Sequence, residues 1–205
     1  MKIAMRWLLV TILVSLATLL LVTFRAPVVQ GASDHVRWDI FHFNPATTPP
    51  TFSAGGVDYA YARNPSALTI TLTGSGTFEP DDPGAVTGGG TWETFNGTTS
   101  TGSGSYQVTG LVFWRLGSLQ TGSFIDLIDD GARANGTAIL RIRYSDGTEG
   151  VLNIGCHGPG APDGILEGVI ATKDYVTYWD GQAPVGGVDA DRTIFHVPEP
   201  SSASD

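Results

Sequence analysis

Apolar and polar residues alternate along several short segments of this chain, which is the pattern of β-strands with one buried face. The clearest segments are Leu68–Phe78, Thr137–Tyr144 and Arg192–Val197. In the second of these, the apolar residues at 138, 140, 142 and 144 are expected to face a core, whereas Arg141 and Arg143 face water. The spacing of two residues therefore predicts strands rather than helices.

Further strands are predicted over 35–43, 58–63, 87–95, 104–116, 149–156 and 165–172. The segment 124–128 fits a short strand or one helical turn, and 173–179 fits a continuation of the preceding strand or a short helix. Turn residues such as Pro80–Gly84 and Asp146-Gly147 separate them. About eight short strands and very little helix predict an all-β fold. We expect a single antiparallel β-barrel built as a meander, with a β-sandwich as the alternative.

A glycine-rich pattern occurs three times at a spacing of fourteen residues: Gly74–Phe78, Gly88–Trp92 and Gly102–Tyr106. Folding the chain between the copies sets two glycines of the first copy opposite two of the second, and sets Trp92 opposite Tyr106. Glycines two apart lie on the same face of a strand, so the facing pairs clear a patch of sheet of side chains. Such a patch lets the sheet bend, which favours the barrel.

The first 32 residues form a secretory signal layout, with Lys2 and Arg6 before an apolar run and small residues before position 33. An uncleaved single-pass anchor is the alternative, because the apolar run is long for a signal. The all-β domain is expected over 33–197 and a disordered tail over 198–205. The sequence therefore predicts a secreted or extracytoplasmic protein.

The formal net charge of the chain is −9. Three of its eleven basic residues lie in the predicted signal, so eight basic and twenty acidic residues follow, a net charge of −12. This acidity argues against a nucleic-acid partner and against binding to an anionic membrane. Cys156 is the only cysteine, so the chain can form no internal disulfide. The sequence does not indicate the oligomeric state.

Few residues suggest a site. His42 and His196 lie in the first and last predicted strands, and a closed meander would pair those strands. Together with Glu167 they could form a polar cluster in the barrel interior, with Cys156 and the aromatic Trp114 beside it. The simpler interpretation is that both histidines, and Cys156, are core residues. No motif indicates a metal or a cofactor.

The glycine-rich copies, the segment 106–112, Cys156 and the segment 192–196 make most of the chain after the signal similar to secreted microbial proteins of unassigned function. More loosely, the glycine-aromatic strands resemble the small antiparallel barrels of allene oxide cyclase and dirigent proteins. That resemblance implies a barrel, and no catalytic residue is carried over from it.

We expect an exported, non-enzymatic domain that binds a small hydrophobic molecule or a glycan, or that serves at the cell surface. The alternative is a barrel enzyme of the cyclase or isomerase kind, which would act on a hydrophobic molecule through interior His and Glu residues. An apolar cavity lined by His42 and His196 would favour the enzyme. A filled interior with aromatic residues on the surface would favour the binding protein.

Overall fold

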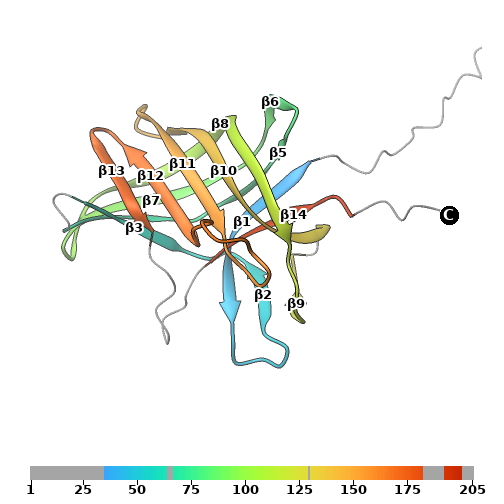
Figure 1. The fold of residues 1–205 in the computed structure, drawn as a ribbon. Coiled ribbons are helices and arrows are strands. Elements are labelled where there is room, and N and C mark those ends of the chain that lie inside the picture. Colours follow the sequence, from blue (N-terminus) through green and yellow to red (C-terminus); the bar gives the residue numbers. More distant parts are fainter. Residues whose placement is uncertain (1–34, 64–66, 129, 182–191, 200–205) are drawn as a thin grey trace, which may run out of the picture. The chain divides into compact units, whose positions relative to one another are not determined.

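A computed structural model of the protein describes residues 35–63, 67–128, 130–181 and 192–199. These residues form fourteen strands and no helix (Figure 1), so the predicted all-β class is confirmed. The predicted signal over 1–32 and most of the predicted tail lie outside the described residues.

The strands vary from two to twenty-one residues. In chain order they are β1 (Val36–Asn44), β2 (Thr51–Ala54), β3 (Asp58–Ala62), β4 (Leu68–Leu72), β5 (Ser75–Glu79), β6 (Asp82–Val86), β7 (Gly89–Asn96), β8 (Thr99–Leu119), β9 (Ile125–Asp126), β10 (Ala132–Tyr144), β11 (Glu149–Cys156), β12 (Gly168–Lys173), β13 (Val176–Gly181) and β14 (Arg192–Val197).

The strand pairings close on themselves. From β7 they run through β4, β3, β13, β12, β11 and β10 to β8, which pairs again with β7. A second path leads from β10 through β14, β1 and β5 back to β7. The first and last described strands therefore pair, as predicted, with Arg37 opposite His196. All these pairs are antiparallel, whereas β2 and β9 pair in parallel.

The main core fills the space that these strands enclose. It includes the completely buried side chains of Trp38, Phe78, Tyr144 and Phe195, together with aliphatic residues from β4, β10, β11 and β12. The residues at 138, 140, 142 and 144 all belong to it, so the predicted inward face of β10 is confirmed. Burial of apolar area on this scale is the main force that holds the sheet together.

The structure corrects two predicted segments. Leu68–Phe78 is two strands, because β4 pairs with β3 and β7 whereas β5 leaves at Gly74 to pair with β1. Pro80–Gly84 is only partly a turn, since β6 begins at Asp82 and pairs with β5. These divisions raise the strand number above the predicted eight.

The facing glycines are found where the repeat predicted them. Ser75 pairs with Gly89, which sets Gly76 beside Gly88 and Gly74 beside Gly90. A Cβ atom at Gly90 would overlap the carbonyl oxygen of Thr73 and lie 2.7 Å from the Cα of Gly74. Glycine is required here because two backbones approach closely.

The predicted pair of Trp92 and Tyr106 is wrong. Trp92 lies opposite Gly104, and Tyr106 lies opposite Gly90. The prediction needs a fold midway between the two residues, near Thr99, whereas Asn96 pairs with Thr99 and the turn lies at Gly97 and Thr98. A bulge in β8, where Thr101 is the extra residue opposite Thr94 and Phe95, shifts the register by one more residue.

β1 and β14 are buried on both faces. Trp38 and Phe195 face the main core, whereas Phe41 and Ile194 face a smaller cluster with Phe52 of β2. β2 and β9 continue the sheet beyond β1, and with the segments next to them they cover Phe41 and Ile194. They are called the second layer below, and they form one wall of a pocket.

Candidate functional site

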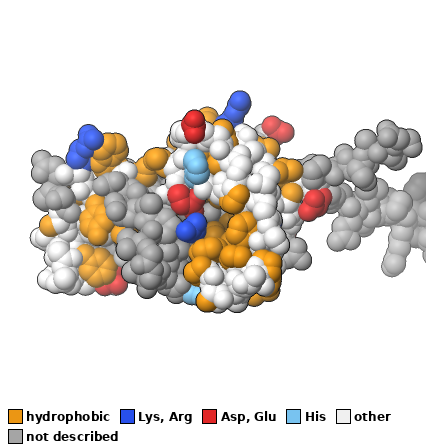
Figure 2. All heavy atoms as spheres, turned by 60° about the horizontal axis from the view of Figure 1, so that its bottom comes forward, with side chains coloured by type: hydrophobic (Ala, Val, Ile, Leu, Met, Phe, Trp, Pro, Cys, Tyr) orange, Lys and Arg blue, Asp and Glu red, His pale blue; other side chains and the backbone are white. Residues whose placement is uncertain are grey.

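A pocket of about 240 Å³ lies where the second layer meets the sheet. It is called the phenylalanine pocket below. It is lined by Phe41, Phe43, Phe52, Gln120, Phe124, Cys156, His157, Gly158, Pro159, Glu167, Arg192 and Thr193. In the view of Figure 2, hydrophobic side chains gather beside a basic and an acidic side chain.

Four aromatic rings form the apolar wall of the pocket. Phe41 and Phe43 lie two apart on β1 and so share a face, and Phe43 pairs with Phe52 of β2. The ring centroids of Phe41 and Phe52 are 4.7 Å apart, and Phe124 stacks on Phe52 at 4.6 Å. A wall of contacting rings is preorganised for an apolar molecule.

Glu167 supplies a carboxylate at the polar edge. The backbone N–H of Thr193 donates to Oε1 over 3.1 Å, and the backbone N–H of His157 donates to Oε2 over 2.5 Å. Burial raises the pKa of this carboxyl group, while the two backbone hydrogen bonds and Arg192 partly oppose the shift. The carboxylate is therefore held in one position.

Arg192 brings a guanidinium group to the same pocket. Its Cζ lies 4.6 Å from the ring centroid of Phe43, a cation–π contact. The Nε atom is buried and has no hydrogen-bond partner among the described residues. A buried donor without an acceptor is rare in folded proteins, which makes this group notable.

Cys156 is 1% exposed, which confirms the prediction of a buried residue. Its Sγ accepts a hydrogen bond from Nε2 of Gln120 over 3.1 Å. Burial raises the pKa of the thiol far above its usual range, so the thiolate that a nucleophile needs is disfavoured. Cys156 therefore contributes shape to the pocket.

Of the predicted cluster, the structure brings together Glu167 and Cys156 and separates the histidines from them. His42 pairs with Ser53 of β2, five residues along β1 from the partner of His196. Residues opposite each other in a sheet share a face, so His196 lies with Arg37 and not with His42. The predicted common interior for both histidines is wrong.

His196 belongs instead to a buried polar group beneath β9. Its Nε2 lies 2.9 Å from Oδ2 of Asp126. On the neighbouring strand, Arg37 donates from Nε and Nη2 to the buried carboxylate of Asp39 over 2.8 and 3.0 Å. The contact of His196 with Asp126 joins β14 to β9, whereas the pair of Arg37 and Asp39 lies within β1, and both have a structural role.

Trp114 is packed between two rings of the main core. Its ring centroid lies 5.2 Å from that of Phe78 and 4.7 Å from that of Phe195, both edge to face. It does not line the phenylalanine pocket, so its contacts are those of a core residue.

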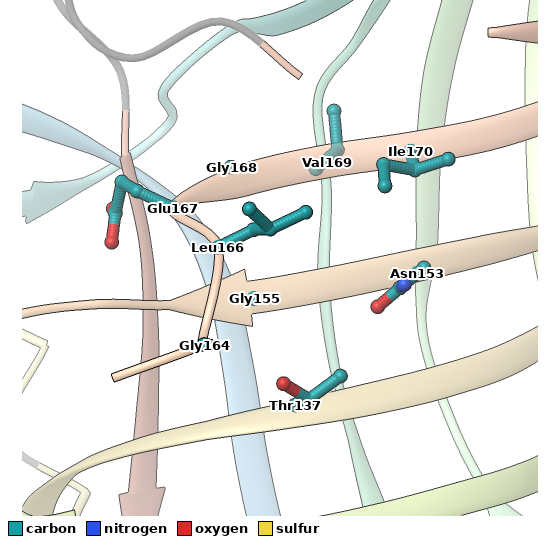
Figure 3. Close-up of a pocket in the computed structure, with 9 residues that line it drawn as sticks. All are labelled: Thr137, Asn153, Gly155, Gly164, Leu166, Glu167, Gly168, Val169 and Ile170. Carbon is teal, nitrogen blue, oxygen red and sulfur yellow. The ribbon is translucent and has the colours of Figure 1, made fainter. Parts of the chain in front are cut away.

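A smaller pocket, of about 110 Å³, lies on the outer surface of β10, β11 and β12. Figure 3 shows that the Glu167 side chain points away from the other residues that line it. The remaining polar groups there are Thr137 and Asn153, so this pocket offers less chemistry than the phenylalanine pocket.

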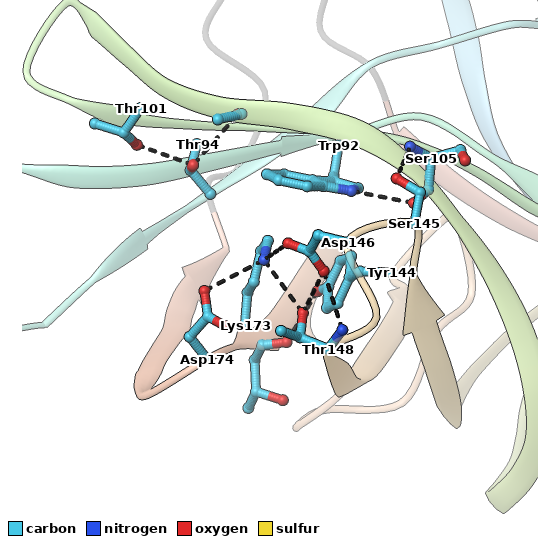
Figure 4. Close-up of polar contacts among 12 residues, drawn as sticks. Trp92, Thr94, Thr101, Ser105, Tyr144, Ser145, Asp146, Thr148, Lys173 and Asp174 are labelled. Carbon is cyan, nitrogen blue, oxygen red and sulfur yellow. Dashed lines mark hydrogen bonds and ion pairs between the residues drawn. The ribbon is translucent and has the colours of Figure 1, made fainter.

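Lys173, which is 5% exposed, forms a further polar cluster, shown in Figure 4. Its Nζ donates to Asp146 over 2.5 Å, to Thr148 over 3.2 Å and to Asp174 over 3.2 Å. It also lies 4.3 Å from the ring centroid of Trp92. Since the ammonium group already has three acceptors and an aromatic face, the cluster is satisfied without a ligand.

This cluster predicts an acid-sensitive contribution to stability. The hydrogen bond from Lys173, followed by that from Thr148, lowers the pKa of Asp146 to about 2. A carboxyl group with a lowered folded pKa stabilises the protein above its ordinary pKa near 4 and loses this effect as the pH falls through 2. Asp146→Asn should therefore reduce the free energy of unfolding by about 1 kcal/mol at pH 7, a modest value because Asp146 is partly exposed.

The measurement is urea unfolding at pH 7 and at pH 2. The deficit of Asp146→Asn should shrink at the lower pH, because the wild-type carboxylate is then losing its charge. Glu149→Gln is the control, since the pair of Glu149 with Arg143 is exposed and contributes little at either pH. An equal deficit at both pH values would contradict the assignment.

Among the described residues, no group of three or more His, Cys, Asp or Glu side chains is placed to hold a metal ion. The same residues contain no helix of a length and hydropathy that would cross a bilayer. Comparisons with protein families, with curated proteins and with solved structures give no match, so the family resemblance stays a prediction.

Proposed function

We propose that this protein is an exported binding domain whose phenylalanine pocket holds a small apolar molecule. The observation that carries the proposal is the wall of four contacting phenylalanines next to a fixed carboxylate and a guanidinium. Binding sites are typically apolar pockets with a few converging polar groups. At about 30 Å³ for each water molecule, the pocket has room for roughly eight waters, the scale of a single-ring molecule.

The proposal includes a β-barrel as the fold. The closed circuit of pairings through β7, β4, β3, β13, β12, β11, β10 and β8 supports it. The pocket lies outside this circuit, between the sheet and the second layer. The rigid sheet would hold Arg192 and Thr193 in place, while β2 and Phe124 provide the other wall.

A barrel enzyme that acts through interior His and Glu residues is less well supported. Large side chains fill the main core, and His42 and His196 lie on opposite faces of the sheet. Glu167 is the one predicted polar residue that meets the pocket together with Cys156, whose thiol is kept protonated by burial. Simple binding needs fewer assumptions.

A glycan is also a weaker candidate than a small molecule. Tyr59, Tyr61 and Trp179 are aromatic residues at the surface of β3 and β13. However, the rings of Tyr59 and Tyr61 are nearly perpendicular, at 86°, and Arg63 covers one face of Trp179 at 3.9 Å. A flat platform for stacking sugars is therefore not formed.

The test is an NMR titration of the full chain with benzyl alcohol, a neutral single-ring probe. We expect saturable shifts at residues around the phenylalanine pocket. Phe43→Ala should weaken binding by about tenfold, because it removes about 1 to 2 kcal/mol of apolar contact. Phe113→Ala is the control, since Phe113 is 47% exposed on β8 and does not line the pocket. Equal loss in both variants, or shifts elsewhere only, would refute the proposal.

A further inference from the structure

Arg192 has no ionic partner within the described part of the chain. No hydrogen bond or ion pair from its guanidinium is found there, and its Nε is buried. The guanidinium lies against the face of Phe43, with Cζ 4.6 Å from the ring centroid. The buried Nε–H thus lacks the hydrogen bond that usually compensates for burial of a polar group.

Glu167 is near enough to interact with Arg192 electrostatically, but it does not form an ion pair with it. Both of its oxygens accept backbone N–H groups, from Thr193 and His157, and no ion pair joins it to Arg192. Those two bonds hold the carboxylate against the backbone. The guanidinium of Arg192 is therefore left without an acceptor on Glu167.

The geometry of arginine makes the missing acceptor specific. A guanidinium presents N–H groups in pairs, and such a pair matches the two oxygens of a carboxylate. Both Arg192 and the phenylalanine wall line the same pocket. An occupant that satisfies both needs one acid group and an apolar body.

We infer that the ligand of the phenylalanine pocket is a small apolar carboxylate, whose acid group pairs with the guanidinium of Arg192 while its body lies among the phenylalanines. The inference rests on the proposed binding function and narrows its ligand class. Glu167 would stand beside the acid group. The charge of Arg192, which already favours the charged form of Glu167, would offset the repulsion between the two acid groups.

The experiment compares two probes of the same ring size, benzoate and benzyl alcohol, by NMR titration of the full chain at pH 7. Benzoate should bind about tenfold more tightly, because only it can form the two-oxygen pair with Arg192. Arg192→Gln should remove this preference, so that benzoate and benzyl alcohol bind this variant with affinities within about twofold of each other. Arg192→Lys keeps the charge without the fork, so it should recover only part of the preference.

Arg133→Gln is the matched control. Arg133 lies over the rings of Phe52 and Phe124 but does not line the pocket, so the preference for benzoate should persist in this variant. If both probes bind with equal affinity and Arg192→Gln changes neither affinity, the assignment of a carboxylate ligand is wrong and the proposed binding function stands. If neither probe binds, the proposed function fails and the inference fails with it. Folding of each variant is checked from its amide spectrum before titration.

Discussion

Gly90→Val should reduce the free energy of unfolding by at least about 3 kcal/mol. This is the largest loss that we expect from a substitution at a residue that is not fully buried. A Cβ atom at Gly90 would overlap the carbonyl oxygen of Thr73, so the strands on either side would have to separate. Separation would weaken the contact of β7 with β4 and β5, which holds two closed paths of the sheet together. Urea unfolding of the purified domain measures the loss.

Gly110→Ala provides the comparison for this substitution. Gly110 also lies within a strand, β8, but the nearest atom to a Cβ there is the carbonyl oxygen of Pro83 at 3.5 Å, an ordinary contact. Its effect should stay within about 1 kcal/mol. Gly90→Ala belongs in the same series, because any Cβ meets Thr73. If the two alanine variants were equally stable, the close approach of the strands would be wrong.

Trp114→Ala should destabilise the domain by about 3 kcal/mol, since it removes a large ring from between Phe78 and Phe195. For a domain of this size, that corresponds to a fall in Tm of roughly 6 to 12 °C. The experiment also tests the role of this residue. Because Trp114 does not line the phenylalanine pocket, the folded fraction of the variant should bind benzyl alcohol as wild type does.

Trp179→Ala is the matched tryptophan control. Trp179 is 39% exposed, and its described ring contact is the guanidinium of Arg63, so the loss should be below about 1 kcal/mol. If Trp114→Ala kept wild-type stability but no longer bound the ligand, Trp114 would be a residue of the binding site and not of the core.

The fold class and several strand bounds could be predicted from the sequence because they depend on local patterns. β11 and β14 have the predicted bounds, and the inward face of β10 follows directly from its alternation. The facing glycines were also predictable, since one tight connection sets their register. The bulge in β8 was not, because its extra residue, Thr101, leaves no mark in the repeat.

The candidate site was predicted only in part, because the sequence does not show the register in which distant strands pair. Alternation shows that His196 shares a face with Ile194, but it does not show which face of β1 lies beside them. The pairing of Arg37 with His196 decides this and separates His42 from His196. Arg192 was missed because a charged residue at the start of a strand usually faces water. The available signal was the apolar second face of β1, with Phe41 and Phe43, which implies a further layer above the sheet.

The pairing of β1 with β14 also makes the described domain nearly circular as a polypeptide. Val36 and Val197 stand at neighbouring ends of adjacent strands, so a short linker could join them outside the sheet. The chain could then be opened at Gly97, an exposed turn where a Cβ would meet no atom within 4 Å. Every strand pairing would be kept in such a circular permutant. The order in which the strands are synthesised is thus separable from the architecture that they form.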